Sequence, residues 1–529
     1  MGNDDVVARA KAWFAAEPDD DIRAELTALI NTAGTELEAR FDGRLQFGTA
    51  GLRAAIGAGP QRMNRLVVRQ AAAGLARYVL EQWPDAAQRG IIIGFDARHK
   101  SSDFAIDTAR VVAAAGIRAL LLPSALPTPV LAWNITEYGA IAGVMVTASH
   151  NPPADNGYKV YLADGAQIVP PHDAGIARCI DGVDPCTVPI ADADHHLIER
   201  LDASGEERYL QSVPGVRLCP QIPGVGVAYT AMHGVGGATA LQAFARSGLP
   251  VPSVVAAQQQ PDPDFPTVAF PNPEEPGAMD LLVAEARASG ALLALANDPD
   301  ADRLGAAIPT PDGGWRRLTG DELGWLLADH ILGHTTGDDR LVVTTLVSSS
   351  LLSRMATAHG VHFEETFTGF KWIGRTVLNH PDLRFVFGYE QALGYLVAQQ
   401  PMDKDGITAA VLMAEVAALA AFDGVSLQDR LDAIALRYGH HITAEQSVRL
   451  DPAIAAQRVI ALRDAPPAEV GGLSVTGVEW FDEAGLLRVW LGDIRLQVRP
   501  SGTEPKVKLY GEAIGRDPAP YLATLAALL

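Results

Sequence analysis

The sequence predicts an α/β protein whose chain ends in a smaller α+β part. Short apolar runs rich in β-branched residues, such as 91–95 and 341–346, recur along the chain with the length of buried strands. Segments with helical periodicity separate these runs, and such alternation predicts sheets covered by helices. After residue 439 strands follow one another across short turns, which predicts the smaller C-terminal part.

The first part of the chain contains one complete run of alternating elements. Residues 5–40 have helical periodicity, and the proline and acids at 18–21 are expected to break this helix into two pieces. The apolar run 140–146 predicts a buried strand, which Asn-Pro at 151–152 terminates. The other expected elements are a helix at 64–83, a strand at 91–95, a helix at 102–115, a strand at 118–122 and a helix that begins near 126–129.

The alternation restarts twice, although no sequence repeat relates the three parts. The first restart contains a glycine-rich loop at 232–237 and an irregular, proline-rich and acidic segment at 260–276. Its expected elements are helices at 202–213, 238–247 and 279–289 and strands at 225–229, 250–256 and 292–296. The second restart has expected strands at 341–346, 362–366 and 385–388, helices at 350–358 and 407–422, and a loop at 368–371.

The C-terminal part begins with a helix signal. Asp451 is expected to cap a helix whose first turn holds Pro452. Four strands with short turns follow, at 473–481, 486–491, 494–498 and 506–510.

Composition excludes several classes of protein. The chain has 529 residues, 48% of them hydrophobic, which is enough for several domains. A formal net charge of -21 argues against nucleic acid or an anionic membrane as the main partner. The three cysteines, Cys179, Cys186 and Cys219, lack CxxC spacing, so neither a disulfide framework nor a zinc site is predicted. The acidic N-terminus and the absence of a long apolar run predict a cytoplasmic protein.

One loop places a serine at the end of the expected strand 140–146. It has the sequence Thr147-Ala148-Ser149-His150-Asn151-Pro152. Lys159 follows on what we expect to be the same connection, where its ammonium group could hold a phosphate or pass a proton. Loops of this composition also cap helices and form turns, so the segment alone leaves a catalytic Ser149 open.

Three carboxylates, Asp298, Asp300 and Asp302, occur within five residues and are oxygen ligands suited to a hard cation such as magnesium. On a straight strand such side chains sit about 7 Å apart, too far to share one ion, so Pro299 and the strand end must curl the segment. The EF-hand pattern fails, because the sixth position is Arg303 and not glycine. An acidic surface loop remains the alternative, although an arginine beside the acids favours a phosphate held on the metal.

Other segments carry groups suited to phosphate or sugar. The segment 45–53 has two glycines and ends in Arg53, and the segment 499–506 combines cations, hydroxyls and a glycine. Lys371 and Glu390 are expected in loops that follow strands. A glycine turn, a β-turn and a surface glutamate are the alternatives for these sites. His150 and His233 are ambiguous, with structural hydrogen bonding as the default.

Four motifs in this order resemble the α-D-phosphohexomutase superfamily and span nearly the whole chain. They are Thr147 to Pro152, Asp298 to Arg303, Gly388-Tyr389-Glu390 and Arg499-Pro500-Ser501-Gly502-Thr503. The segments 47–53 and 368–372 resemble the branch that holds bacterial phosphoglucomutases and phosphomannomutases and animal phosphopentomutases. The resemblance implies four domains around a central cleft, three related α/β domains with mixed sheets and a smaller C-terminal α+β domain. Their expected ranges are 1–212, 213–325, 326–438 and 439–529.

The resemblance also implies roles for individual residues. Ser149 would be the phosphoserine that exchanges a phosphoryl group with the sugar, and it would join the three aspartates in binding one Mg²⁺. The other implied catalytic residues are Lys159, as a general acid/base, Arg53 and His150. The implied substrate-binding residues are Arg303, Thr368, Gly369, Lys371, Glu390, Arg499, Ser501, Gly502 and Thr503. Many relatives have a serine where this chain has Ala392, so one expected hydrogen bond to the sugar is missing.

The expected activity is therefore that of a phosphohexomutase. It would interconvert the 1- and 6-phosphates of glucose, and of mannose as well, with glucose 1,6-bisphosphate as activator and intermediate. A phosphopentomutase acting on ribose or deoxyribose phosphates is the alternative, followed by a metal-dependent sugar phosphatase and a non-catalytic sugar-phosphate-binding regulator. The expected partner is a small sugar phosphate, with neither nucleic acid nor membrane, and the expected state is a monomer or a homodimer.

Overall fold

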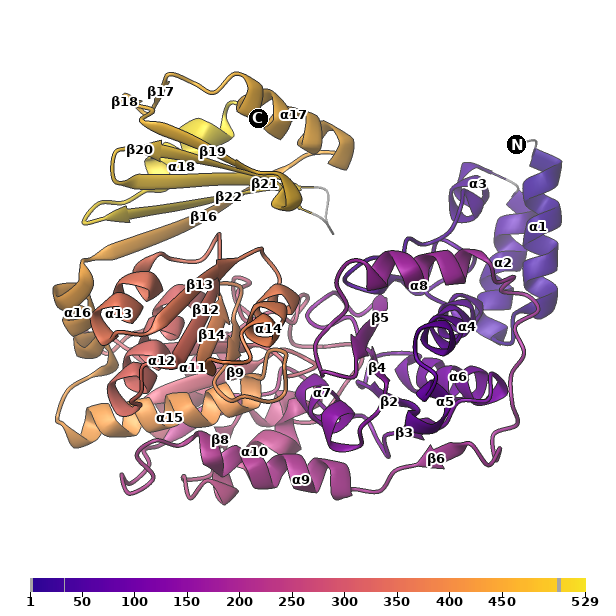
Figure 1. Cartoon of the computed structure of the whole chain (residues 1–529), viewed down its shortest axis with the longest axis horizontal. Coiled ribbons are helices and arrows are strands. Elements are labelled where there is room, and N and C mark those ends of the chain that lie inside the picture. Colours follow the sequence, from indigo (N-terminus) through magenta and orange to yellow (C-terminus); the bar gives the residue numbers. More distant parts are fainter. Residues whose placement is uncertain (1–2, 33, 502–505) are drawn as a thin grey trace. The chain divides into compact units, whose positions relative to one another are not determined.

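The computed structural model of the chain describes residues 3–32, 34–501 and 506–529, which form two compact units (Figure 1). The first unit comprises Met1–Arg317 and Gly394–Leu419, and the second comprises Leu318–Leu393 and Ala420–Leu529. The fold is mixed α/β with a separate C-terminal sheet, as the sequence predicts. The chain therefore leaves the first unit after Arg317 and returns to it for one segment.

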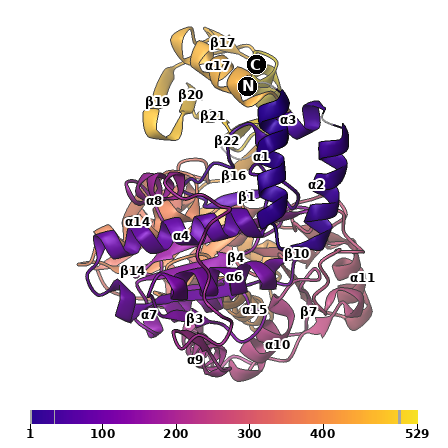
Figure 2. The ribbon, with the colours of Figure 1, turned by 90° about the vertical axis from the view of Figure 1, so that its right-hand side faces the viewer.

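The N-terminal helices are α1 (Asn3–Ala16), α2 (Asp20–Thr32) and α3 (Thr35–Phe41). Figure 2 shows α1 and α2 as an antiparallel pair. The predicted break at 18–21 is confirmed, because α1 ends before Pro18 and α2 begins after it. Trp13 packs edge-on against Phe41 with 5.9 Å between ring centroids, so α1 and α3 share one core.

The turn between α1 and α2 buries an acid. Glu17 is 1% exposed, and its Oε1 accepts a hydrogen bond from the backbone N–H of Asp19 at 3.2 Å. Among the described residues, no donor reaches its Oε2. Burial therefore raises the pKa of Glu17 from 4.5 to about 7.

Glu17→Gln should stabilise the protein at pH 8 much more than at pH 5. Between pH 4.5 and about 7 the folded state binds more protons at this carboxyl than the unfolded state, so stability falls as pH rises through that window. Above the window the charged Glu17 lowers the free energy of unfolding by about 3 kcal/mol, which the neutral amide avoids. Chemical unfolding at the two pH values measures the difference. The exposed Glu38→Gln is the control, and an equal gain at both pH values would contradict this titration.

The first sheet has the strand order β1-β5-β4-β2-β3-β6. Strand β4 (Ala142–Val146) is buried along its whole length, which suits a strand inside a sheet between two layers of helices. Helices α6 and α7 lie on opposite sides of this sheet (Figure 1). The other elements are β1 (Leu52–Ala55), α4 (Arg65–Gln82), α5 (Ala86–Arg89), β2 (Ile91–Phe95), α6 (Ser101–Ala114), β3 (Ala119–Leu121), α7 (Thr128–Glu137), β5 (Asp155–Leu162), α8 (His172–Asp181) and β6 (Ile198–Arg200).

Lys159 lies inside a strand and not in a loop, contrary to the sequence-based expectation. Strand β5 runs antiparallel to β4 and pairs Lys159 with Met145. The Asn156-Gly157 pair, which suggests a turn, instead continues the strand. Glycine is required at 157 because a Cβ there would come within 2.6 Å of the Thr147 carbonyl oxygen. A lysine in a central strand is held more rigidly than one on a loop.

The second sheet also belongs to the first unit and has the order β11-β10-β9-β7-β8. The predicted irregular segment 260–276 contains neither helix nor strand. Glu415 anchors the returning segment, because it accepts hydrogen bonds from Arg217 Nε at 2.8 Å and from the Leu218 N–H at 2.7 Å. The elements of this part are α9 (Ser204–Ser212), η1 (Val213–Val216), β7 (Val227–Thr230), α10 (Gly236–Arg246), β8 (Ser253–Val254), η2 (Ala256–Gln258), α11 (Asp280–Ser289), β9 (Leu293–Asn297), β10 (Leu304–Pro309) and β11 (Trp315–Arg317). The returning segment adds β15 (Gly394–Leu396), which is not a strand of this sheet, and α15 (Gly406–Phe422).

In the second unit, β12 (Arg340–Thr345) pairs in parallel with β13 (His362–Thr366) and β14 (Arg384–Glu390). The predicted loop 368–371 is wrong in part, because helix α14 (Phe370–Asn379) begins within it. This helix buries Phe370, Ile373 and Gly374, and its other residues are half-buried except the exposed Asn379. Lys371 is therefore in its first turn and not in a loop. The remaining helices are α12 (Gly320–His334), α13 (Leu351–His359) and α16 (Leu427–Tyr438).

The C-terminal sheet of the second unit is antiparallel, with the order β16-β22-β21-β20-β19. Asp451 caps α17 by accepting the Ala453 N–H at 2.9 Å, as predicted. The elements are β16 (His441–Arg449), α17 (Pro452–Asp464), β17 (Glu469–Val470), β18 (Leu473–Ser474), β19 (Gly477–Phe481), η3 (Asp482–Ala484), β20 (Leu486–Leu491), β21 (Ile494–Pro500), β22 (Lys506–Ile514) and α18 (Ala519–Ala526).

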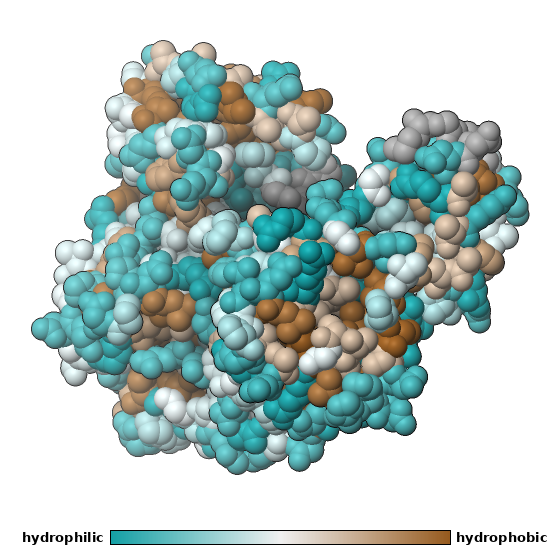
Figure 3. Space-filling view, turned by 45° about the vertical axis from the view of Figure 1, so that its right-hand side comes forward, coloured by the Kyte–Doolittle hydropathy of each residue, from teal (hydrophilic) through white to brown (hydrophobic). Residues whose placement is uncertain are grey.

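In the part of the chain that the structure describes, no single helix has the length and apolar composition needed to cross a membrane. Helices α15 and α16 reach that threshold only when taken together, and the chain bends sharply between them. The face shown in Figure 3 has several separate hydrophobic patches among hydrophilic residues.

Candidate active site

The loop after β4 presents a buried serine hydroxyl. Ser149 is 3% exposed and has a φ of 52°, a conformation that residues other than glycine rarely adopt. Its backbone N–H donates to Thr147 Oγ1 at 2.9 Å. Its Oγ donates to Asp298 Oδ2 at 2.7 Å and lies 3.2 Å from His150 Nδ1. The serine thus faces a carboxylate from a different sheet.

The turn between β9 and β10 gathers three aspartates. Ala301 has a φ of 56°, and its N–H donates to the Asp298 carbonyl at 2.9 Å. This curl places one carboxylate oxygen from each of Asp298, Asp300 and Asp302 within 4.8 Å of the others. All three side chains are fully buried. This turn is the curl that the sequence predicted, because the three carboxylates must approach one another to share a cation.

The glycine-rich loop 232–237 packs against the aspartate turn at Pro299. A Cβ on Gly234 would lie 2.4 Å from the Pro299 Cα, so only glycine permits this close approach. The Val235 N–H donates to the Pro299 carbonyl at 2.8 Å. His233 does not enter the site, because its Nε2 lies 2.8 Å from Thr267 Oγ1 in a structural hydrogen bond.

The free oxygens of this turn fit a divalent cation. Among the described residues, no hydrogen-bond donor reaches Asp300 Oδ1 or Asp302 Oδ1, although both atoms are buried. Asp298 Oδ1 accepts the Arg303 N–H at 3.0 Å. Unpartnered buried carboxylate oxygens are costly unless a cation neutralises them, and hard oxygen donors suit Mg²⁺.

Two lysines add positive charge to the aspartates. Lys159 Nζ lies 2.7 Å from Asp300 Oδ2 and 2.8 Å from Asp302 Oδ2, and Lys404 Nζ lies 3.2 Å from Asp302 Oδ2. Burial alone would raise the pKa of Asp302, but Lys159 and Lys404 outweigh it and hold the pKa well below its usual value. Burial and the two neighbouring carboxylates instead raise the pKa of Asp298.

Lys404 is the site residue that sequence reasoning missed. It is 8% exposed and belongs to the segment that returns to the first unit. Its neighbour Asp403 is held by Tyr161 and Gln167, whose side chains donate to Asp403 Oδ2 at 2.8 Å each. Asp405 accepts the N–H groups of the first turn of α15. The only sequence signal was a lysine between two acids immediately before a helix.

The structure brings the other predicted residues of the first unit to this loop. Arg53 Nη1 donates to Asn151 Oδ1 at 3.1 Å. Arg303 lies 3.6 Å from Glu274 in an ion pair. Burial, followed by the charges of Arg303 and Arg53, lowers the pKa of His150 well below its usual value, so its imidazole is neutral.

The predicted residues of the second unit form two further groups. Thr368, Gly369 and Lys371 follow β13, and Glu390 ends β14, so they share the carboxyl edge of the parallel strands. Arg499 lies at the end of β21, where the Ser501 N–H donates to the Lys506 carbonyl at 2.8 Å. Gly502 and Thr503 lie outside the described residues.

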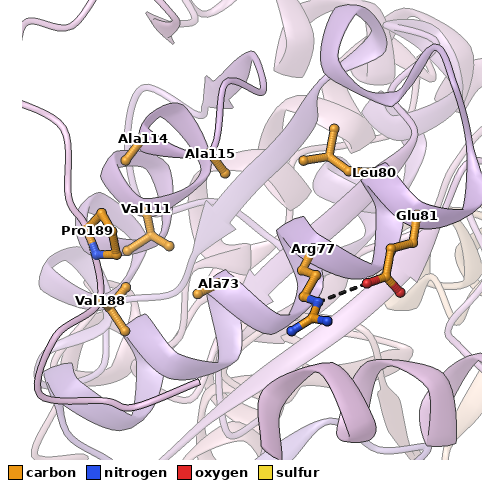
Figure 4. Close-up of a pocket in the computed structure, with 9 residues that line it drawn as sticks. All are labelled: Ala73, Arg77, Leu80, Glu81, Val111, Ala114, Ala115, Val188 and Pro189. Carbon is orange, nitrogen blue, oxygen red and sulfur yellow. Dashed lines mark hydrogen bonds and ion pairs between the residues drawn. The ribbon is translucent and has the colours of Figure 1, made fainter. Parts of the chain in front are cut away.

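A separate cavity of about 360 Å³ lies between α4, α6 and the segment 188–189 (Figure 4). Its lining is mainly apolar, and its charged groups, Arg77 and Glu81, pair with each other at 2.8 Å. This cavity has no residue in common with the Ser149 loop or the aspartate turn.

The fold and this arrangement define a sugar-phosphate mutase, an enzyme that moves a phosphoryl group within one substrate. The sequence matches the alpha/beta/alpha domains I, II and III of the phosphoglucomutase/phosphomannomutase family over residues 44–185, 207–313 and 319–438. The chain therefore belongs to the phosphoglucomutase/phosphomannomutase family, whose members depend on a metal.

Relatives with different substrates in their names resemble the chain to a similar degree. A "Probable phosphomannomutase" of Haemophilus influenzae is 41% identical over 471 residues, 86% of this chain and 94% of that protein. A "Probable phosphoribomutase" of Schizosaccharomyces pombe is 36% identical over 544 residues, 94% of this chain and 92% of that protein. The crystal structure of a family protein from Burkholderia thailandensis has the same fold, with a TM-score of 0.69 at 21% identity over 91% of this chain and 96% of that one.

Proposed function

We propose that the chain is a Mg²⁺-dependent phosphohexomutase that interconverts the 1- and 6-phosphates of glucose, and of mannose as well. The observation that carries this proposal is the buried Ser149 hydroxyl 2.7 Å from Asp298, inside a turn of three aspartates. A serine in this position can carry a phosphoryl group next to a cation. A protein that only binds sugar phosphates would have no use for such a nucleophile.

In the proposed reaction, phosphoserine 149 transfers its phosphoryl group to a hydroxyl of the sugar phosphate. The Oγ–P bond breaks as a bond between phosphorus and the sugar oxygen forms, and the proton of the sugar hydroxyl ends on the Ser149 Oγ that the phosphoryl group leaves. Lys159 is the candidate for exchanging that proton, and Arg53 lies beside the same loop. Asp298, Asp300 and Asp302 would hold Mg²⁺, which supplies charge neutralisation to phosphoryl transfer. The bisphosphate then returns its other phosphoryl group to Ser149.

We assign recognition of the sugar and of its second phosphate to residues of the second unit. Glu390 would accept hydrogen bonds from sugar hydroxyls, and Lys371 with the Thr368-Gly369 pair would lie near it. A second phosphate would bind Arg499 and the hydroxyls that follow it. The proposed domains are 1–212, 213–325, 326–438 and 439–529, and glucose 1,6-bisphosphate is the proposed activator.

A phosphopentomutase is the second candidate. The relative described as a probable phosphoribomutase matches 94% of this chain, which supports this activity about as well as the hexose activity. Many relatives have a serine at the position of Ala392, so this position does not favour a hexose phosphate over a pentose phosphate.

Competing assays with glucose, mannose and ribose 1-phosphates, with Mg²⁺ and glucose 1,6-bisphosphate present, test the proposal. We expect glucose 1-phosphate to have the highest kcat/KM, and intact mass with peptide mapping to place one phosphate on Ser149 in the active protein. A higher kcat/KM for ribose 1-phosphate would replace the hexose assignment by the pentose one. Steady release of free phosphate from the sugar would indicate a phosphatase instead.

A further inference from the structure

A buried arginine lies behind the Ser149 loop. Arg98 follows β2, and it is 4% exposed. Its Nη2 donates to the carbonyl oxygens of Ser149 at 2.5 Å and of Asn151 at 2.6 Å, and its Nη1 donates to that of Pro152 at 2.8 Å. One guanidinium group therefore holds three of the four carbonyls from Ser149 to Pro152, all except that of His150.

Asp96 links Arg98 to the base of the same loop. One oxygen of Asp96 accepts the Thr147 hydroxyl at 2.6 Å, and the other accepts the Arg98 N–H at 3.0 Å and the Ser101 hydroxyl at 2.6 Å. Thr147 Oγ1 in turn accepts the Ser149 N–H. Both backbone groups of Ser149 are thus tied to the pair Asp96 and Arg98, the N–H through Thr147 and the carbonyl directly.

Phe265, from the part of the first unit that contains the second sheet, packs on the guanidinium of Arg98. The ring of Phe265 lies 4.9 Å from the Arg98 Cζ, in the geometry of a cation–π contact. Asp298, which accepts the Ser149 hydroxyl, comes from the same domain as Phe265. Arg98 therefore contacts both the Ser149 loop and Phe265, which belongs to the part of the chain that carries the aspartate turn.

These contacts explain how Ser149 keeps an unfavourable backbone conformation. A φ of 52° is disfavoured by about 1–2 kcal/mol for a residue with a Cβ, so neighbouring interactions must maintain it. In a trans peptide the N–H points opposite to the C=O. Because Arg98 attracts the Ser149 carbonyl, the N–H of His150 points away from the guanidinium, and the orientation of the whole peptide is set.

We propose that Arg98 is a positioning residue for phosphoryl transfer, which acts through the backbone of the Ser149 loop and touches neither sugar nor phosphate. This inference rests on the proposed function, since it assigns Arg98 a role in presenting the phosphoserine. A lysine would keep the charge but lacks the planar fork that serves three carbonyls at once. A misplacement of about 1 Å at a reacting group lowers rates on the order of 100-fold.

The test compares Arg98→Lys and Arg98→Ala with the wild-type protein. We expect kcat to fall about 100-fold in both variants while KM for the sugar phosphate changes less than about threefold, because Arg98 does not contact the substrate. Methylguanidinium should restore part of the kcat of Arg98→Ala, and the fraction of Ser149 that glucose 1,6-bisphosphate phosphorylates should recover with it. Arg118→Lys, which changes an arginine of the same unit whose side chain is 39% exposed, is the control and should match the wild type.

Wild-type kcat in a folded Arg98→Lys would overturn the inference. The same holds if kcat, KM and the melting temperature worsen together and methylguanidinium restores nothing, because Arg98 would then serve stability alone. If Arg98→Ala does not fold, Arg98→Lys alone tests the inference, through its kcat, its KM and the fraction of its Ser149 that is phosphorylated. A wild-type protein that never carries phosphate on Ser149 would instead remove the proposed function, and this inference with it.

Discussion

Ser149→Ala is expected to reduce mutase turnover on the order of 10⁴-fold or more, because no other hydroxyl can replace a covalent phosphoryl carrier at this position. The fold should survive, since the substitution removes one oxygen and leaves Asp298 with the Arg303 N–H as a donor. Binding of the sugar phosphate, measured by calorimetry, should stay within about tenfold of wild type because most of its proposed contacts lie elsewhere.

Ser102→Ala is the matched control for this experiment. Ser102 is exposed at the start of α6, and its substitution should leave turnover unchanged. Mass spectrometry after incubation with glucose 1,6-bisphosphate should show one added phosphate on the wild type and on Ser102→Ala, and none on Ser149→Ala. Turnover that survives in Ser149→Ala would mean that a different nucleophile carries the phosphoryl group.

Asp300→Asn should have the second largest effect. The amide keeps the shape of the carboxylate but removes a negative charge from the aspartate turn, so the affinity for Mg²⁺ should fall and kcat should drop on the order of 10³-fold. Removing metal from the wild type with a chelator should abolish turnover, and added Mg²⁺ should restore it. Binding of Mn²⁺, followed by electron paramagnetic resonance, reports the site independently of turnover, and we expect one ion per chain.

The control for the aspartate turn is Asp194→Asn, because Asp194 is an exposed aspartate of the first unit. It should bind Mn²⁺ and turn over like the wild type. Unchanged Mn²⁺ binding in Asp300→Asn would exclude Asp300 as a ligand. Full activity of the chelated wild type would show that the three carboxylates serve another purpose.

Local patterns predicted the parts of the site that depend on neighbouring residues. The apolar run before Thr147 predicted a buried strand ending at the serine loop, and β4 ends at Val146. The spacing of the three aspartates required a curl, and the turn at Ala301 provides it. Helix α14 was missed because the preceding Thr368-Gly369 pair has the composition of a loop, although Phe370, Ile373 and Val377 have helical spacing.

Contacts between distant residues were beyond the reach of such patterns. Lys404 meets Asp302 only because a segment about a hundred residues further along the chain returns to the first unit. The role of Arg98 had no signal in the sequence, since neither the loop at 149–152 nor Phe265 is near it in the chain. The strand position of Lys159 depends on pairing between β5 and β4, which an Asn-Gly pair obscured.

The return of Gly394–Leu419 to the first unit also constrains how the protein is made. Domains generally fold during synthesis from the N-terminus onward, as units that close once their residues have left the ribosome. Here the first unit cannot be complete when Arg317 emerges, because Lys404 and the Glu415 anchor on Arg217 still lie ahead. The ribosome must first translate the stretch Leu318–Leu393, which belongs to the second unit. The buried aspartates thus acquire their second lysine only late in synthesis, and no single cut in the gene separates the two units.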